Sequence, residues 1–153
     1  MNRLIMVLAT GFYVGRMPKA PGTWGSIAAL LPWMLIKDLT LTSYFLLLGA
    51  MFIVGFFVAG SAEKIVDCPD ARCIVIDEFV GIFITLAAAP DHPVAWIVGL
   101  IYFRIFDIGK PFPVSWFDRR IHGGAGIMMD DVIAGIYAWI SLQLTWAATG
   151  RFL

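Results

Sequence analysis

The chain has 153 residues, a length that suits one domain, and we expect residues 1–153 to form a single membrane-embedded unit. Hydrophobic residues make up 60% of it and charged residues 14%, against roughly 45–50% and about 25% in ordinary globular chains. The formal net charge is zero, so no overall basic field points to nucleic acid as a partner. A mean hydropathy of +0.85 indicates lipid as the solvent.

Apolar segments follow one another along the chain, separated by short polar stretches. They are residues 26–36, 44–60, 79–89, 94–103 and 132–149. The second and the last approach the roughly 20 residues that a helix needs to cross a membrane, and the others are shorter. Because the runs are continuous rather than alternating, helices are favoured over a barrel. We predict an all-α fold, a polytopic membrane bundle of about four to six helices, some short or tilted.

Two turns set the expected course of the chain. Pro90 and Pro93 in "PDHP" should make the third and fourth segments antiparallel, and "KDLTLTS" separates the first two. Counting reversals brings the starts of the third and last segments and the end of the fourth to one membrane face. We expect that face to be cytoplasmic, because basic residues gather there while the opposite face has only Lys37 and Arg151. The gathered residues are Arg16, Lys19, Lys64, Arg72, Arg104, Lys110, Arg119 and Arg120.

Acidic residues are predicted to converge at the same face. Asp77 and Glu78 begin the third segment, Asp130 and Asp131 begin the last, and Asp107 ends the fourth. Carboxylates at short range repel one another unless they share a cation, and a hard divalent ion such as Mg²⁺ takes oxygen ligands of this kind. We therefore expect these five residues to bind Mg²⁺. The simpler alternative for each pair is a helix N-terminus, where acidic side chains complement the helix dipole.

Glycine-rich stretches near the acidic residues suggest anion binding. "PGTWGS" at 21–26 places Gly22 and Thr23 at the start of the first segment, where backbone N–H groups can reach an anion. Plain capping by Thr23 or Ser26 is the alternative. "HGGAG" at 122–126 is predicted to be a loop whose N–H groups cradle phosphate, or else an ordinary flexible loop.

Basic residues around the acidic group have two interpretations each. Arg104 and Asp107 share a helix face, so Arg104 can bind substrate or form an ion pair within the helix. Lys110 precedes a proline and should leave the helix, either as a point charge that reaches outward or as a snorkelling lysine. "WFDRRIH" at 116–122 supplies Arg119 and His122, either as an interfacial anchor or with His122 as proton donor to a leaving group.

A metal, several cations and a position at lipid level together point to a phosphorylated lipid headgroup. The chain lacks the C-x5-R and D-x-D-x-T/V motifs of covalent phosphatases, so attack by a metal-activated water is favoured, with a carboxylate as base. Two other classes stay open. One is a cation transporter or channel that uses the carboxylates. The other is a noncatalytic assembly subunit that packs through Gly49, Gly55 and Gly60.

"PGTWGS", "DEFVG" and "FRIFDIGKPFPVSWFDRRIHGGAGIMMDDVIAG" resemble the phosphatidylglycerophosphatase A family, from about residue 18 to the end of the last segment. The resemblance implies a Mg²⁺-dependent enzyme of the bacterial inner membrane, facing the cytoplasm, that converts phosphatidylglycerophosphate to phosphatidylglycerol and phosphate. It implies catalytic roles for Asp77, Glu78, Asp107 and Asp131, and leaves open which of them is the base. The family's basic and loop positions match Gly22, Thr23, Arg104, Lys110, Arg119 and His122 as substrate-binding residues.

Overall fold

A computed structural model describes residues 2–69 and 71–149, apart from the side chains of residues 117–119. All regular structure in this part of the chain is helical, which confirms the all-α prediction. The described residues form seven α-helices and one 3₁₀ turn, slightly more than the four to six predicted helices, because α1 and α6 are short and correspond to no predicted apolar segment. The elements are α1 (Asn2–Ala9), η1 (Val14–Arg16), α2 (Pro21–Ile36), α3 (Leu41–Val66), α4 (Ile76–Thr85), α5 (Pro93–Gly109), α6 (Val114–Arg120) and α7 (Gly123–Thr149).

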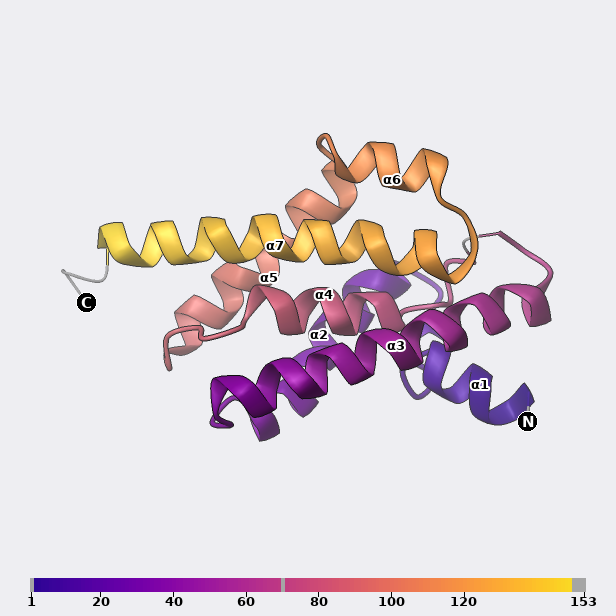
Figure 1. Cartoon of the computed structure of the whole chain (residues 1–153), viewed down its shortest axis with the longest axis horizontal. Helices are drawn as coiled ribbons and strands as arrows, with labels where there is room; N and C mark the ends of the chain where they lie inside the picture. Colours follow the sequence, from indigo (N-terminus) through magenta and orange to yellow (C-terminus); the bar gives the residue numbers. More distant parts are fainter. Residues whose placement is uncertain (1, 70, 150–153) are drawn as a thin grey trace.

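Helix α4 is the centre of the bundle, although it is one of the shorter helices. It packs against α7, α2, α3 and α5, and Figure 1 shows it lying between α7 and α3. Its residues Val80, Ile82 and Phe83 are fully or almost fully buried, as are Phe103 of α5 and Leu142 of α7. A helix enclosed on all sides in this way needs no polar face, which explains its almost wholly apolar sequence after Glu78.

Long apolar helices expose much of their surface. By length and composition α3 and α7 are the described helices that could cross a membrane, and only 22% of the most apolar window of α3 is buried inside the protein. Leu46 and Phe57 of α3 and Ile105 of α5 are each more than half exposed. Soluble monomers rarely present apolar surface on this scale, so the exposed faces of these helices are expected to contact lipid.

The two predicted turns lie together at one end of the bundle. Lys37 follows α2, and its Nζ lies 2.9 Å from Oδ1 of Asp91 in the turn between α4 and α5. His92 caps α5 by accepting a hydrogen bond from the Val94 N–H, and Pro93 is the first residue of the helix. The starts of α4 and α7 and the end of α5 are therefore gathered at the opposite end, as the count of reversals predicted.

The stretch "HGGAG" at 122–126 is not the loop that the sequence suggested. Helix α6 precedes it, and α7 begins already at Gly123, so its glycines lie in the first turn of α7. A Cβ on Gly124 would overlap the Phe56 carbonyl of α3, and one on Gly60 would lie 3.2 Å from the Gly124 nitrogen. These glycines thus permit close contact between α3 and α7. The prediction of a loop here, whether phosphate-binding or merely flexible, was wrong, because residues 123–126 are helical.

Candidate active site

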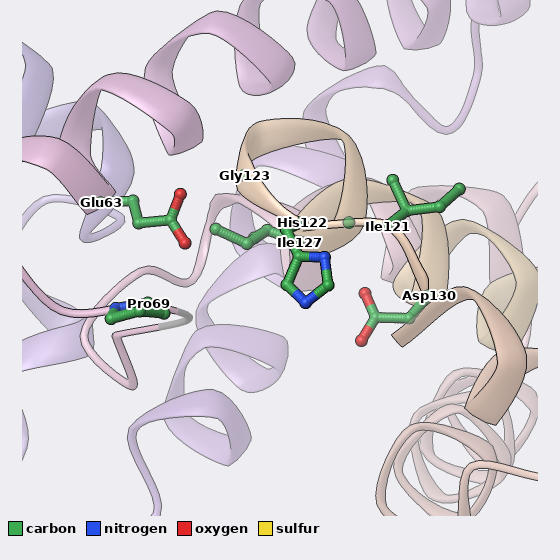
Figure 2. A pocket seen from close by; sticks show the side chains of 8 residues that line it. Glu63, Pro69, Ile121, His122, Gly123, Ile127 and Asp130 are labelled. Carbon is green, nitrogen blue, oxygen red and sulfur yellow. The ribbon is translucent and has the colours of Figure 1, made fainter. Parts of the chain in front are cut away.

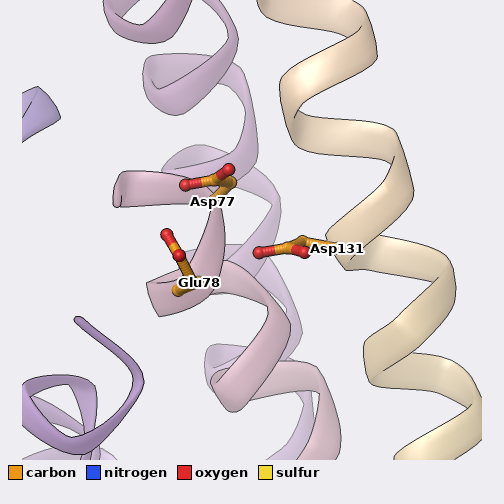
Figure 3. Close-up of side chains that lie close together, drawn as sticks. All are labelled: Asp77, Glu78 and Asp131. Carbon is orange, nitrogen blue, oxygen red and sulfur yellow. The ribbon is translucent and has the colours of Figure 1, made fainter. Parts of the chain in front are cut away.

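Three carboxylates meet where α4 and α7 lie side by side. Asp77 and Glu78 come from the first turn of α4 and Asp131 from the third turn of α7, and Figure 3 shows the three side chains pointing toward one another. One oxygen of each lies within 4.8 Å of the others. Glu78 is 9% exposed and Asp131 3%, and the described residues give Asp77 Oδ1, Glu78 Oε2 and Asp131 Oδ2 no hydrogen-bond donor.

The charge of this carboxylate cluster, Asp77, Glu78 and Asp131, needs compensation. Shielding from solvent raises the pKa of Asp77 well above its ordinary value, and the neighbouring charge of Glu78 raises it further. Burial raises the pKa of Glu78 to about 8, and the charges of Asp131 and Asp107 act in the same direction. Both groups stand at the start of α4, outside the two candidate spans. Protons or a cation must neutralise the cluster.

Arg104 of α5 supplies one positive charge beside the cluster. Its Nη1 lies 2.6 Å from Asp107 Oδ2 and 3.9 Å from Glu78 Oε1, and it donates a 3.3 Å hydrogen bond to Ser26 Oγ. The ion pair within α5 that the sequence offered as an alternative is therefore present. Because Arg104 also faces Glu78, it ties α5 to the start of α4.

Lys110 and Asp130 form a second ion pair at the same end of the bundle. Lys110 ends α5 in a left-handed backbone conformation with φ 40°, and so leaves the helix as predicted. Its Nζ lies 2.9 Å from Asp130 Oδ2. The Asp131 N–H donates a 3.0 Å hydrogen bond to the other carboxylate oxygen of Asp130, so both oxygens of this side chain have partners.

The predicted convergence of five acidic residues is confirmed by the cavity that they line. The cavity has a volume of about 590 Å³, within the range of roughly 300–1,000 Å³ typical of small-molecule sites. The start of α2, the segment before α4, the end of α5 and the α7 acids all contribute to it. Its lining residues are Ala20, Pro21, Gly22, Ala71, Arg72, Ile74, Asp77, Glu78, Arg104, Asp107, Ile108, Lys110, Asp130 and Asp131.

The N-terminus of α2 approaches the cluster closely because Gly22 has no side chain. A Cβ at this position would overlap Glu78 Oε1 and lie 3.3 Å from an Arg104 nitrogen. The hydrogen-bond ladder of α2 begins with the Trp24 N–H, which donates to the Ala20 carbonyl at 3.2 Å. The backbone N–H groups of Gly22 and Thr23 therefore precede the ladder, as in helix N-termini that bind anions. Thr23 itself is half-buried and does not line the cavity.

His122 lies apart from the large cavity. It is exposed and lines a separate pocket of about 60 Å³ with Glu63, Pro69 and Asp130, as Figure 2 shows. Asp130 is common to both pockets. The predicted substrate contact at Arg119 falls on a side chain outside the described part of the chain.

Arg72 was counted among the basic residues of this face, but the sequence did not single it out as a site residue. It precedes Asp77 by five positions, and the structure places it on the cavity wall. Its nearness to "CIVIDE" in the chain was the available signal. That signal is weak, because residues between helices have no periodicity that fixes where a side chain points.

The exposed apolar faces of the bundle and the carboxylate cluster buried at one end of it are features of a membrane-associated helical protein. A family model described as "Phosphatidylglycerophosphatase A" matches residues 7–146, and the chain belongs to this family. The chain is 42% identical over 131 residues to phosphatidylglycerophosphatase A of Escherichia coli strain K12, covering 85% of this chain and 76% of the relative. The recognised resemblance is thereby confirmed.

Two further relatives show the breadth of the comparison. Phosphatidylglycerophosphatase A of Haemophilus influenzae is 43% identical over 138 residues, which cover 89% of this chain and 85% of the relative. A Bacteroides thetaiotaomicron protein with the provisional name phosphatidylinositol-3-phosphatase is 39% identical over 149 residues, 92% of each chain. No solved structure matches the chain significantly.

Proposed function

We propose that the protein is a Mg²⁺-dependent phosphatidylglycerophosphatase that hydrolyses the terminal phosphomonoester of phosphatidylglycerophosphate to phosphatidylglycerol and phosphate. Membership of the family and two relatives that carry the name of this activity support the substrate. The observation that carries the proposal is the meeting of Asp77, Glu78 and Asp131, each with a shielded oxygen that no described donor contacts.

The donor set suits a hard divalent cation. Asp77, Glu78 and Asp131 would hold Mg²⁺ directly, since oxygen ligands are the ones it prefers. Asp107 and Asp130 are paired with Arg104 and Lys110, so they would act around the ion and orient the ligands rather than crowd it. When bound, Mg²⁺ would neutralise the carboxylates, polarise the phosphoryl oxygens and activate a water for attack on phosphorus.

The protein's own groups bind and orient the phosphate. Arg104, Lys110 and the N–H groups at the start of α2 line or border the cavity and offer donors to its oxygens. A carboxylate of the cluster accepts the proton of the attacking water. As the new P–O bond forms, the bond from phosphorus to the glycerol oxygen breaks, and that oxygen takes up a proton to give phosphatidylglycerol.

A place in the bacterial inner membrane, with the cavity facing the cytoplasm, is part of the proposal. The exposed apolar faces of α3 and α5 support contact with lipid. The excess of basic residues at the cavity end supports the cytoplasmic orientation by positive-inside bias. Fusing a reporter after Thr149 and another in the turn around Asp91 tests it, because both positions lie away from the cavity and should report the opposite compartment.

The two other classes explain the structure less well. A transport path would spread its acidic residues through the bilayer depth, whereas here they line one cavity at one end of the bundle. A noncatalytic assembly subunit would use Gly49, Gly55 and Gly60 for contact with a partner. Only Gly49 is open among these three, because Gly55 packs on Met128 and Gly60 on Gly124 within the chain. Hydrolysis accounts for both the cluster and the cations around it.

Phosphate release from a panel of lipid phosphates, with and without EDTA, tests the proposal. The panel contains phosphatidylglycerophosphate, phosphatidylinositol 3-phosphate and phosphatidic acid in the same detergent. We expect release from phosphatidylglycerophosphate that stops with EDTA and returns with excess Mg²⁺. Release from phosphatidylinositol 3-phosphate alone would replace the substrate, and release that ignores EDTA would remove the metal from the mechanism.

A further inference from the structure

Arg72 lines the cavity of the candidate active site, but the proposed hydrolysis does not use its side chain. It lies in the segment between α3 and α4, five residues before Asp77, and its side chain is exposed. The cavity that it lines also contains the carboxylate cluster and the N-terminus of α2. An exposed arginine on this wall can therefore reach a ligand whose other end lies on the cluster.

Among the described residues three basic side chains line the cavity, and two of them already have acidic partners. Arg104 lies 2.6 Å from Asp107, and Lys110 lies 2.9 Å from Asp130. Arg72 makes no hydrogen bond or ion pair with any residue that the structure describes. Its guanidinium, with five N–H donors and a permanent charge, is available for an anion from outside the chain.

The chemistry of the proposed substrate supplies such an anion. Its headgroup carries two phosphates, a terminal monoester and the phosphodiester that joins the headgroup to diacylglycerol. The carboxylate cluster with its metal can take one of them, and the cavity of about 590 Å³ is larger than a single phosphate requires. Because Arg104 and Lys110 are already paired with Asp107 and Asp130, the second phosphate needs a cation of its own.

We propose that Arg72 binds the phosphodiester of the headgroup, and so makes the enzyme prefer lipids with two phosphates to lipids with a lone phosphomonoester such as phosphatidic acid. The assignment of the two phosphates rests on the proposed function. The names of the relatives agree with it in one respect: phosphatidylglycerophosphate and phosphatidylinositol 3-phosphate each combine a phosphomonoester with a phosphodiester.

The test separates binding from turnover. The full chain in detergent with Mg²⁺ is titrated with glycerophosphoglycerol, the deacylated product headgroup, which has the diester and no cleavable monoester, and with glycerol 3-phosphate, which has only the monoester. We expect Arg72→Ala to weaken glycerophosphoglycerol binding about tenfold, the size of one charge-assisted contact, and to leave glycerol 3-phosphate binding unchanged. Arg72→Lys should lie between wild type and Arg72→Ala.

Arg16→Ala is the matched control, because Arg16 is an exposed arginine predicted at the same membrane face that stacks on Tyr13 and does not line the cavity. In steady-state assays Arg72→Ala should raise KM for phosphatidylglycerophosphate about tenfold while kcat stays within twofold. Equal effects of the two variants, or equal weakening of both headgroup ligands, would overturn the inference. If wild type fails to hydrolyse phosphatidylglycerophosphate while Arg72→Ala still weakens glycerophosphoglycerol binding, the proposed function fails and the diester contact stands.

Discussion

Gly81 of α4 and Gly135 of α7 touch so closely that a Cβ on Gly135 would lie 2.7 Å from the Gly81 carbonyl oxygen. The contact lies one turn beyond Asp77 and Glu78 in α4 and one turn beyond Asp131 in α7. The distance between these two helices at this crossing therefore sets how near Asp131 comes to Asp77 and Glu78. Two glycines far apart in the chain thus control the geometry of the acidic cluster.

Gly135→Ala should separate α4 from α7. The added methyl group meets backbone rather than a flexible side chain, so overpacking should lower the free energy of unfolding by about 1–3 kcal/mol. The wider spacing should also weaken Mg²⁺ binding, measured by calorimetry on protein in detergent. Gly49→Ala is the control, because a Cβ at Gly49 meets nothing within 4 Å and alanine favours the helix. Equal Mg²⁺ affinity in both variants would show that the crossing does not control the cluster.

Asp131→Asn should abolish Mg²⁺-dependent phosphate release while the protein stays folded in detergent. The amide has the same shape but no charge, and loss of a direct ligand should cost more than the 10–100-fold typical of residues around a metal. We expect kcat to fall at least about 100-fold. Asp91→Asn, at the opposite end of the bundle, should keep full activity. Retained turnover in Asp131→Asn would remove Asp131 from the mechanism.

Arg104→Ala should destabilise the metal-free protein more than the Mg²⁺-bound protein. Removing the guanidinium leaves Asp107 and Glu78 without their cation, and breaking a buried ion pair costs about 3 kcal/mol. Mg²⁺ should restore part of that stability, because it supplies positive charge at the same place. Thermal unfolding with and without Mg²⁺ measures the difference. A loss that Mg²⁺ does not reduce would show that the ion binds elsewhere.

Metal-free protein should lose stability as pH rises. The raised pKa of Glu78, about 8, means that the folded state holds a proton that the unfolded state has already released above its ordinary pKa of 4.5. The free energy of unfolding should therefore fall from about pH 5 to about pH 8 and then level off.

Mg²⁺ should offset this loss most strongly at the upper end of the range, since it displaces the protons. At 100 times its Kd it adds about 2.7 kcal/mol. Unfolding curves at pH 6, 7 and 8 with EDTA or Mg²⁺ provide the measurement, with Asp77→Asn/Glu78→Gln as the control that should flatten the pH dependence. An unchanged slope in that double variant would assign the titration to other groups.

The sequence by itself determined the helical class, the turns around residues 37–40 and 90–92, and the end of the bundle to which the acidic residues are carried. These features follow from local properties: apolar runs form helices in lipid, prolines break them, and an even or odd number of reversals decides the face. The identity of the family could also be read from contiguous blocks, because those blocks are local in the chain.

Only the tertiary structure decided which acidic residues meet. Asp77, Glu78 and Asp131 form the cluster, whereas Asp107 is held by Arg104 and Asp130 by Lys110, and these pairings depend on how α4, α5 and α7 rotate and cross. The same is true of Gly124, which lies at a contact between helices instead of in a loop, and of Arg72, which a non-periodic segment turns onto the cavity wall. Hydropathy fixes where a helix runs, but side-chain packing between helices fixes its rotation, and no pattern within one segment contains that information.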